Sequence, residues 1–509
     1  MSESRTKNAV RNTVVSVGGY LLYFVFGIIV RKLFLQNLSI ENLGYEGIFG
    51  SIFQILNILD LGAGALLTYR LYRAIAHGEE GEVARLMAMF AWLYRVTAVV
   101  ILAVGAGLAP FLRYIIRDNI GDWAYVYFIY FIQLFGAASI SWLSYYRLFL
   151  EANQRASDAA ITETVFRILG QVGKALVILL WKDYILYLLV TVLTNFLTVL
   201  VIAIKSRRKY PYAFTGRCSL SDFKEPLFLS ELKNGALIKA LNAVYYLTDT
   251  VLISAMAGLR TVALYGNYTM IGNAALAGFQ KVLQPVNASV GNYVHTNPPE
   301  ECYRLFRMMD LLGFYLASFA FAGFFTLFQP VLSILYGKEY LLETGFVLFY
   351  AMYFFFYIKD SIITTFRSTV GYFDKERIWA AASAGANLIL SIVLGKFFGL
   401  TGILIGTVAS SVLFGVGKYT VAYRYCFELP VSRGLMLYGG QILLASAEAC
   451  AVYALCARLP VDIGGILLRG IACVVLPAAI STLLFFSTDA FRSMVGFVRE
   501  KAAFLRKTK

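Results

Sequence analysis

A polar stripe runs along one long apolar stretch of the chain, residues 233–258. Four side chains in it fall at helical spacing and would share one helix face: Lys239, Asn242, Tyr246 and Asp249. The stretch is long enough to cross a bilayer, and a spanning helix does not turn such a stripe toward lipid. The sequence therefore predicts that this stripe faces a water-filled cavity or a partner helix.

A second polar face falls in the apolar run that follows, residues 262–290. Gln280, Gln284 and Asn287 lie on it, with Lys281 beside them. Lys239 and Lys281 are therefore the basic residues that we favour as ligand contacts. Pairing with an acid, or snorkelling of the ammonium group to the membrane surface, is the alternative for both.

The first stripe has a counterpart near the start of the chain. Lys7-Asn8-Ala9 opens the first apolar run, as Lys233-Asn234-Gly235 opens the later one. The same offset maps the stripe onto four residues that are all polar or amphipathic: Thr13, Ser16, Tyr20 and Tyr23. Three further pairs stand 220 residues apart: Pro110 with Pro330, Arg147 with Arg367, and Arg155 with Lys375. The sequence thus predicts two related halves, each beginning with a cavity-facing helix.

Other charged residues also fall inside apolar runs. The basic ones are Arg95, Arg167, Lys174, Lys359, Lys418 and Arg469, and the acidic ones are Asp60, Glu163, Asp360 and Glu448. We expect Arg95, Arg167 and Lys418 to snorkel. Lys359 and Asp360 point about 100° apart on a helix and need different partners. We take Asp249, Asp60, Lys174 and Lys359 as candidates for ion coupling or charge pairing.

Composition defines the class of protein. The 509 residues are 59% hydrophobic and 15% charged, with a mean hydropathy of +0.69, whereas soluble domains carry about 25% charge. We therefore expect an all-α polytopic membrane protein with no cleaved signal peptide. About fourteen spans are predicted, at 13–35, 44–68, 87–111, 123–146, 161–180, 185–204, 234–258, 262–290, 308–332, 343–366, 379–396, 401–422, 436–457 and 463–486.

The basic residues orient these spans. With the N-terminus in the cytoplasm, 28 of the 45 lysines and arginines fall in inner connections and nine in outer ones. Both termini are thus predicted to be cytoplasmic, and the net charge of +15 faces anionic lipid rather than nucleic acid. The expected divisions are a six-helix bundle in 1–204, a cytoplasmic linker in 205–232, a second six-helix bundle in 233–422, and two further helices with a basic tail in 423–509.

Signatures of catalysis and cofactor binding are absent from the sequence. Gly415-Val416-Gly417-Lys418-Tyr419 lacks the spacing and the Ser/Thr of a phosphate-binding loop. The two histidines, His77 and His295, fall in predicted loops, so we expect no metal site. The six cysteines form no CxxC pair, which indicates free thiols. We expect neither catalytic residues nor a cofactor.

Several stretches resemble the polysaccharide transporter family, the Wzx-like flippases of the MOP superfamily. They are LNILDLGAGALLTYRLYRAIA at 56–76, LMAMFAWLYRV at 86–96, VALYGNY at 262–268 and LYGKEY at 335–340. The resemblance covers most of the first twelve spans. It implies two pseudo-symmetric six-helix bundles around a central cavity. It also implies transport of an undecaprenyl-pyrophosphate-linked oligosaccharide to the outer leaflet of the bacterial cytoplasmic membrane by alternating access, with cationic cavity residues near the pyrophosphate.

The resemblance makes eight residues candidates for the substrate cavity: Lys239, Lys281, Asn242, Tyr246, Gln280, Gln284, Tyr20 and Tyr23. It implies membrane lipids and other polysaccharide-assembly membrane proteins as partners, and it leaves Na⁺ or H⁺ coupling open. A flippase for lipid II or a teichoic-acid precursor is the nearest alternative. A MATE-like exporter usually has an acid in its first helix, and residues 13–35 contain none. A polytopic glycosyltransferase or polymerase would need a larger outer loop or a catalytic acid in a loop.

Overall fold

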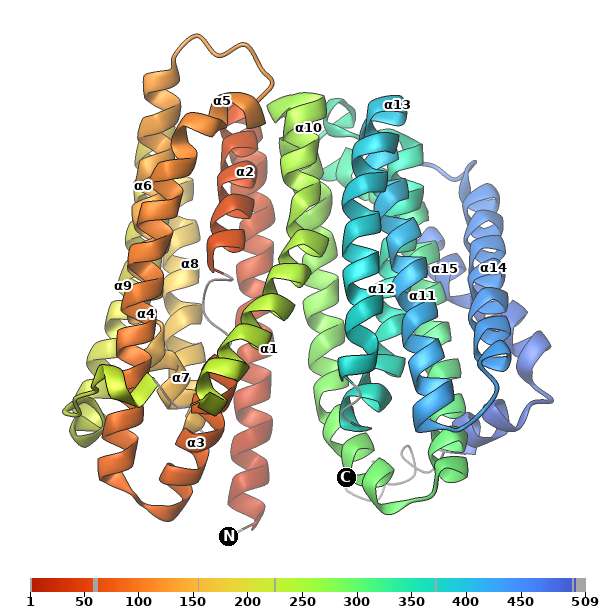
Figure 1. The fold of residues 1–509 in the computed structure, drawn as a ribbon. Coiled ribbons are helices and arrows are strands. Elements are labelled where there is room, and N and C mark those ends of the chain that lie inside the picture. Colours follow the sequence, from red (N-terminus) through yellow and green to blue (C-terminus); the bar gives the residue numbers. More distant parts are fainter. Residues whose placement is uncertain are drawn as a thin grey trace. The chain divides into compact units, whose positions relative to one another are not determined.

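The computed structural model describes residues 2–57, 63–153, 155–223, 226–370, 373–496 and 499. Every regular element in these ranges is helical, which confirms the predicted all-α class (Figure 1). Contacts divide the chain into two compact units, unit 1 over Met1–Ala263 and unit 2 over Leu264–Lys509. The sequence predicted the division within 205–232, whereas the contacts divide the chain after Ala263. The first span of the predicted second half, 234–258, therefore lies within unit 1.

Unit 1 is a helical bundle. In it α1 packs on α8, α4 on α6, and α9 on both α6 and α8. Its helices are α1 (Ser2–Asn37), α2 (Ile40–Asn57), α3 (Ala63–His77), α4 (Glu80–Leu108), α5 (Leu112–Ile115), α6 (Trp123–Leu143), α7 (Tyr145–Ala152), α8 (Ala156–Leu180), α9 (Tyr184–Lys209) and the part of α10 (Pro226–Thr296) up to Ala263. Short 3₁₀ turns are η1 (Ala109–Phe111), η2 (Pro211–Phe214) and η3 (Leu220–Phe223).

Unit 2 is built around α11, which packs on α12, α14 and α15. It contains the last part of α10 (Pro226–Thr296), α11 (Pro299–Leu335), η4 (Lys338–Tyr340), α12 (Thr344–Val370), α13 (Phe373–Val421), the π-helical turn η5 (Ala422–Cys426), α14 (Val431–Cys456) and α15 (Ile463–Phe485). Pro330, two residues before the end of the predicted span 308–332, lies inside α11, which continues to Leu335.

Helix α10 is two helices joined at Gly258. Its 71 residues would extend for about 107 Å if straight, far more than a bilayer core. Gly258 instead adopts φ 82° and ψ 172°, a conformation open to glycine. A loop of unit 1 holds this kink, because Asp118 accepts the N–H of Leu259 at 2.7 Å and Arg117 donates to the carbonyl of Met256 at 2.8 Å.

Helix α13 is likewise two helices, joined at Gly399 with φ 57°. Its halves pack antiparallel, since Ser391 donates to the carbonyl of Ile403 at 3.0 Å and Ser383 to that of Ser410 at 2.7 Å. Between these contacts the buried Asn387 donates to Thr407 and Ser410, each at 3.2 Å. The two halves match the predicted spans 379–396 and 401–422.

Eight helices in the described ranges are long and apolar enough to cross a membrane by length and composition. One of them, Lys375–Cys426, contains two predicted spans on either side of Gly399. Residues 58–62 of the predicted span 44–68 lie outside the described residues, and α2 and α3 cover the parts of the span on either side of them. The total of about fourteen spans remains a prediction.

The predicted linker is partly docked on unit 1. Ala213 is fully buried in a cluster with Phe90 and Phe149, and the ring of Phe214 lies 4.7 Å from that of Tyr146. Farther along, Asp222 forms an ion pair with Arg85 of α4 at 2.7 Å. Residues 210–223, which we call the docked segment, are therefore an ordered part of unit 1.

Candidate functional site

The polar stripe that dominated the sequence lies on α10. Asp249 is buried within it, at 7% exposure. Lys239, Asn242 and Tyr246 belong to the same helix, but their side chains lie outside the described residues. The same holds for the side chains of Tyr20 on α1 and of Lys281 and Gln284 on α10, and for Asp60 altogether. Their assignment to a cavity therefore remains a prediction.

In unit 1, three residues singled out from the sequence take part in contacts between a cation and an aromatic ring. The guanidinium carbon of Arg167 on α8 stands 5.7 Å from the ring centre of Tyr23 on α1. The Nζ of Lys174, also on α8, stands 5.0 Å from the ring centre of Tyr187 on α9. A cation over an aromatic face is stabilised without being neutralised. These residues therefore form a basic face across α1, α8 and α9, in which Arg167 also pairs with Glu163 of α8 at 3.7 Å.

In unit 2, the side chain of the predicted cavity residue Gln280 is described. It is exposed, and its amide nitrogen donates to the hydroxyl of Tyr357 on α12. The rings of Tyr357 and Tyr353 lie 6.4 Å apart on the same helix. Gln280 and Tyr357 thus form a polar pair that joins the last part of α10 to α12.

Unit 2 contains a cluster of buried charges centred on Asp310 of α11. Lys359 of α12 is fully buried and forms an ion pair with Asp310. Tyr419 of α13 donates to the same carboxylate at 2.7 Å, and Gln441 of α14 does so at 3.0 Å. Lys359 also donates to the hydroxyl oxygen of Tyr419 at 2.8 Å. Four helices thus meet at one carboxylate.

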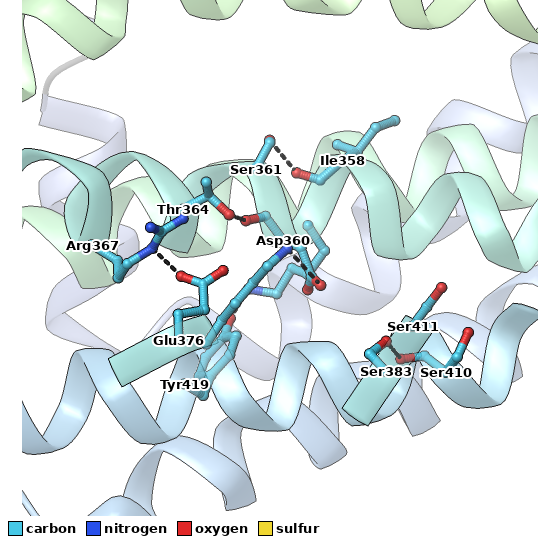
Figure 2. A network of polar contacts seen from close by, with 12 residues as sticks. Ile358, Asp360, Ser361, Thr364, Arg367, Glu376, Ser383, Ser410, Ser411 and Tyr419 are labelled. Carbon is cyan, nitrogen blue, oxygen red and sulfur yellow. Dashed lines mark hydrogen bonds and ion pairs between the residues drawn. The ribbon is translucent and has the colours of Figure 1, made fainter. Parts of the chain in front are cut away.

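Two more ion pairs extend this cluster along α12 (Figure 2). Asp360 pairs with Lys418 of α13 at 3.4 Å, and Arg367 pairs with Glu376 of α13. The expectation that Lys359 and Asp360 need different partners is confirmed. We refer to the six charged residues, Asp310, Lys359, Asp360, Arg367, Glu376 and Lys418, as the charge cluster.

The charge cluster holds helices together. Each cation in it faces a carboxylate inside the protein, and an unpaired charge in such an interior costs several kcal/mol. Lys418 was expected to snorkel, and this was wrong, because Asp360 provides a buried partner for it. Asp310 was missed by the sequence analysis, since it stands at the edge of the predicted span 308–332, whereas α11 begins at Pro299.

A buried acid joins the last two helices, α14 and α15, to the rest of unit 2. One carboxylate oxygen of Glu448 on α14 accepts from Ser318 of α11, and the other accepts from Ser481 of α15 at 2.6 Å. Arg469 of α15 is also buried and donates to the carbonyls of Leu459 and Pro460 at 2.6 and 2.7 Å. Glu448 therefore joins α14 and α15 to α11, and Arg469 joins α15 to the connection that follows α14.

Metal-ligating side chains do not gather anywhere in the described part of the chain, where no group of three His, Cys, Asp or Glu residues is placed to hold an ion.

Comparisons with known proteins place this architecture. A family model described as "Polysaccharide biosynthesis protein" matches residues 9–288. Among solved structures, the chain is similar to a lipid II flippase, MurJ, in an inward closed conformation. The TM-score is 0.68 at 13% identity, over 93% of this chain and 99% of that one.

Two MATE transporters have the same fold. An inward-facing multidrug resistance MATE transporter of the MOP superfamily gives a TM-score of 0.61 at 13% identity, over 85% of this chain and 99% of that one. The VcmN transporter of Vibrio cholerae gives 0.53 at 14%, over 84% and 98%. At these identities the likeness shows the fold. No curated protein matches the sequence significantly.

Proposed function

Because the chain belongs to the polysaccharide biosynthesis protein family, we propose that it is a flippase for an undecaprenyl-pyrophosphate-linked oligosaccharide. The repeat unit would pass from the inner to the outer leaflet of the bacterial cytoplasmic membrane by alternating access. The family match over residues 9–288, more than half of the chain, carries this proposal. Family and fold together make the protein a multi-pass membrane transporter of the MOP superfamily and not an enzyme.

The chemistry of such a substrate fits the residues. Its pyrophosphate and glycan need a wet, positive path through the membrane. Lysine offers pyrophosphate a point charge and arginine offers a planar fork. In the basic face of unit 1, Lys174 supports this role, whereas Arg167 also pairs with Glu163. We assign Lys239 and Lys281 to the path as well. The tyrosines would contact the sugars, and the glutamines Gln280 and Gln284 would contact the polar part of the substrate.

The charge cluster is not part of the proposed path. Its three cations are paired with carboxylates of unit 2, so an incoming anion would have to separate buried ion pairs to reach them. Asp249 would repel a pyrophosphate, and we therefore place the substrate nearer Lys239, with Asp249 in an ion pair or in Na⁺ or H⁺ coupling. The match to MurJ favours a lipid II flippase as the second candidate.

An export assay tests the proposal. The protein is reconstituted in proteoliposomes with a fluorescent lipid-linked oligosaccharide or with lipid II, and outward movement is followed by loss of fluorescence to a membrane-impermeant quencher. We expect transport of the oligosaccharide and slower transport of lipid II. Lys239→Ala and Lys281→Ala should each lower the rate by about tenfold or more, as expected for the loss of a charge-assisted contact.

Lys396→Ala, at an exposed position of α13, serves as the matched control and should transport at the wild-type rate. Faster transport of lipid II than of the oligosaccharide would favour the second candidate. Transport of neither lipid by protein that is correctly folded would exclude both flippase functions. Wild-type rates in both lysine variants would remove these lysines from the path.

A further inference from the structure

An apolar pocket of about 390 Å³ lies within unit 2, between the last part of α10, α11 and α12. All ten of its lining residues are apolar, and they include Ile271, Leu276, Gly323, Phe324, Phe328 and Ile358. The volume lies within the range of about 300–1,000 Å³ that is usual for small-molecule sites. Such a pocket suits a hydrocarbon chain and offers nothing to a sugar or a phosphate.

A polar pair stands close to two of the lining residues along α10 and α12. Leu276 stands one helical turn before Gln280 on α10, and Ile358 follows Tyr357 on α12. Gln280 donates to the hydroxyl of Tyr357, so the two helices that line the pocket also join at this hydrogen bond. A ligand that fits both parts has a polar group directly attached to an apolar chain.

We propose that this pocket binds the first isoprene units of the carrier lipid, with the polar end of the lipid beside Gln280 and Tyr357. The inference rests on the proposed function and deepens it, because it gives the protein a site for the tail as well as for the headgroup. Two of the lining residues, Phe324 and Phe328, have stacked rings whose centres are 4.8 Å apart. Their flat surfaces suit a branched, unsaturated chain.

A tail site beside a headgroup site has a clear physical benefit. Binding two parts of one substrate at once adds apolar burial to the polar contacts, and it fixes the distance between the carrier and the path of the sugar. Saturated acyl chains of bulk lipid are present at far higher concentration. These acyl chains have no pyrophosphate attached directly to them, so they cannot occupy the pocket and contact the Gln280–Tyr357 pair at the same time.

The chain offers a well-matched way to fill the pocket. Gly323 lines it, and a Cβ built on this glycine meets no atom within 4 Å. Gly323→Leu therefore places a branched side chain in the pocket without a backbone clash. Gly439→Leu on α14 is the control, since its Cβ also has open space and the residue is likewise partly buried.

The experiment uses two photoactivatable lipids in nanodiscs that contain the full chain. One is a polyprenyl pyrophosphate with a diazirine on its first isoprene unit, and the other is a phosphatidylglycerol with a diazirine on its acyl chain. Labelled peptides are located by mass spectrometry. We expect the polyprenyl probe to label residues 320–331, and we expect unlabelled polyprenyl pyrophosphate to compete. Gly323→Leu should reduce this labelling and oligosaccharide transport by about tenfold, with no change in Gly439→Leu.

Three results would overturn the inference. They are wild-type transport by a folded Gly323→Leu protein, equal labelling of 320–331 by both probes without competition, and labelling confined to other helices. None of these would touch the proposed function, which fails only if the wild-type protein moves no lipid-linked oligosaccharide.

Discussion

Lys359 and Asp310 show how a charged residue is accommodated in an apolar bundle. Both are almost completely removed from solvent, and the carboxylate accepts from a lysine, a tyrosine and a glutamine on three other helices. Removing one member leaves a buried charge without its counter-ion, which is more costly than replacing both members by neutral groups. The pair therefore fixes an arrangement of helices more than it adds net stability.

We predict that Lys359→Ala lowers the stability of the protein by about 3–5 kcal/mol, seen as a fall in the unfolding temperature in detergent. The double variant Lys359→Met with Asp310→Asn should recover much of this loss, because no full charge then remains buried. Arg304→Ala is the control, since its pair with Glu301 is largely exposed and contributes about 0–1 kcal/mol. An unfolding temperature unchanged by Lys359→Ala would contradict the assigned role of the pair.

At the scale of elements, the turn of the α13 hairpin depends on glycine in two different ways. A Cβ at Gly399 would meet no atom within 4 Å, but the residue adopts a positive φ. Gly402 is helical, and a Cβ there would stand 2.0 Å from the carbonyl oxygen of Leu394. The first glycine permits the turn, and the second allows the two halves to approach closely.

These roles predict different costs for alanine. Gly399→Ala should destabilise by about 1–2 kcal/mol through backbone conformation alone. Gly402→Ala should lower the unfolding temperature further, because the backbone of residue 394 cannot move aside cheaply. Gly385→Ala, in a helical position with open space, should be neutral or stabilising, since alanine is the better helix former. An equal effect at all three positions would refute this reading of the hairpin.

The docked segment has an acid that responds to pH. Asp222 accepts the N–H of Ser219 at 2.8 Å and a guanidinium N–H of Arg85 at 2.7 Å, and these bonds hold its pKa below the usual value. A lowered pKa in the folded state means that Asp222 stabilises docking above its unfolded pKa of about 3.9 and ceases to do so as the pH falls through the lower, folded pKa.

We therefore expect the segment to loosen only in strong acid. The ring of Phe223 lies 4.7 Å from that of Trp92, so the fluorescence of Trp92 reports docking once the other four of the five tryptophans are replaced by phenylalanine. Its emission should shift below about pH 4 in the parent and be shifted at all pH values in Asp222→Asn. A shift centred near neutral pH would assign the transition to another group.

Sequence reasoning recovered elements better than sites. Hydropathy and glycine positions indicate the helices, because span length and backbone conformation are local properties. The divergence of Lys359 and Asp360 also follows from helical geometry alone. Their partners do not, because Asp310 and Lys418 lie 49 and 58 residues away along the chain and meet them only after packing. For the same reason the grouping of residues 233–263 with unit 1 was not predicted.

At the scale of the whole molecule, the two compact units meet in sequence at Ala263 and Leu264. The kink of α10 at Gly258 belongs to unit 1, where Asp118, Arg117 and the loop that carries them hold it. In unit 1, Arg31 of α1 also donates to the carbonyl of Ala263 at 2.9 Å. In an alternating-access cycle, we expect residues 249–263 to move with unit 1.

The proposed orientation has a direct test. Single cysteines at residues 3, 220 and 505, in a chain without its six native cysteines, should react with an impermeant maleimide only after the cells are opened. A cysteine at Gly121, in the exposed connection before α6, should react in intact cells and serves as the positive control. Labelling of residue 220 from outside would invert the topology and remove the two-half arrangement.

The antiparallel seam of α13 also bears on how the chain enters its membrane. Ser383, Asn387 and Ser391 all make their hydrogen bonds to residues that are synthesised later, between Ile403 and Ser410. The first helix released alone into hydrocarbon would carry these groups without partners, at a cost of several kcal/mol. Biogenesis therefore favours a paired release, in which the first helix stays at the translocon until the ribosome has delivered the second.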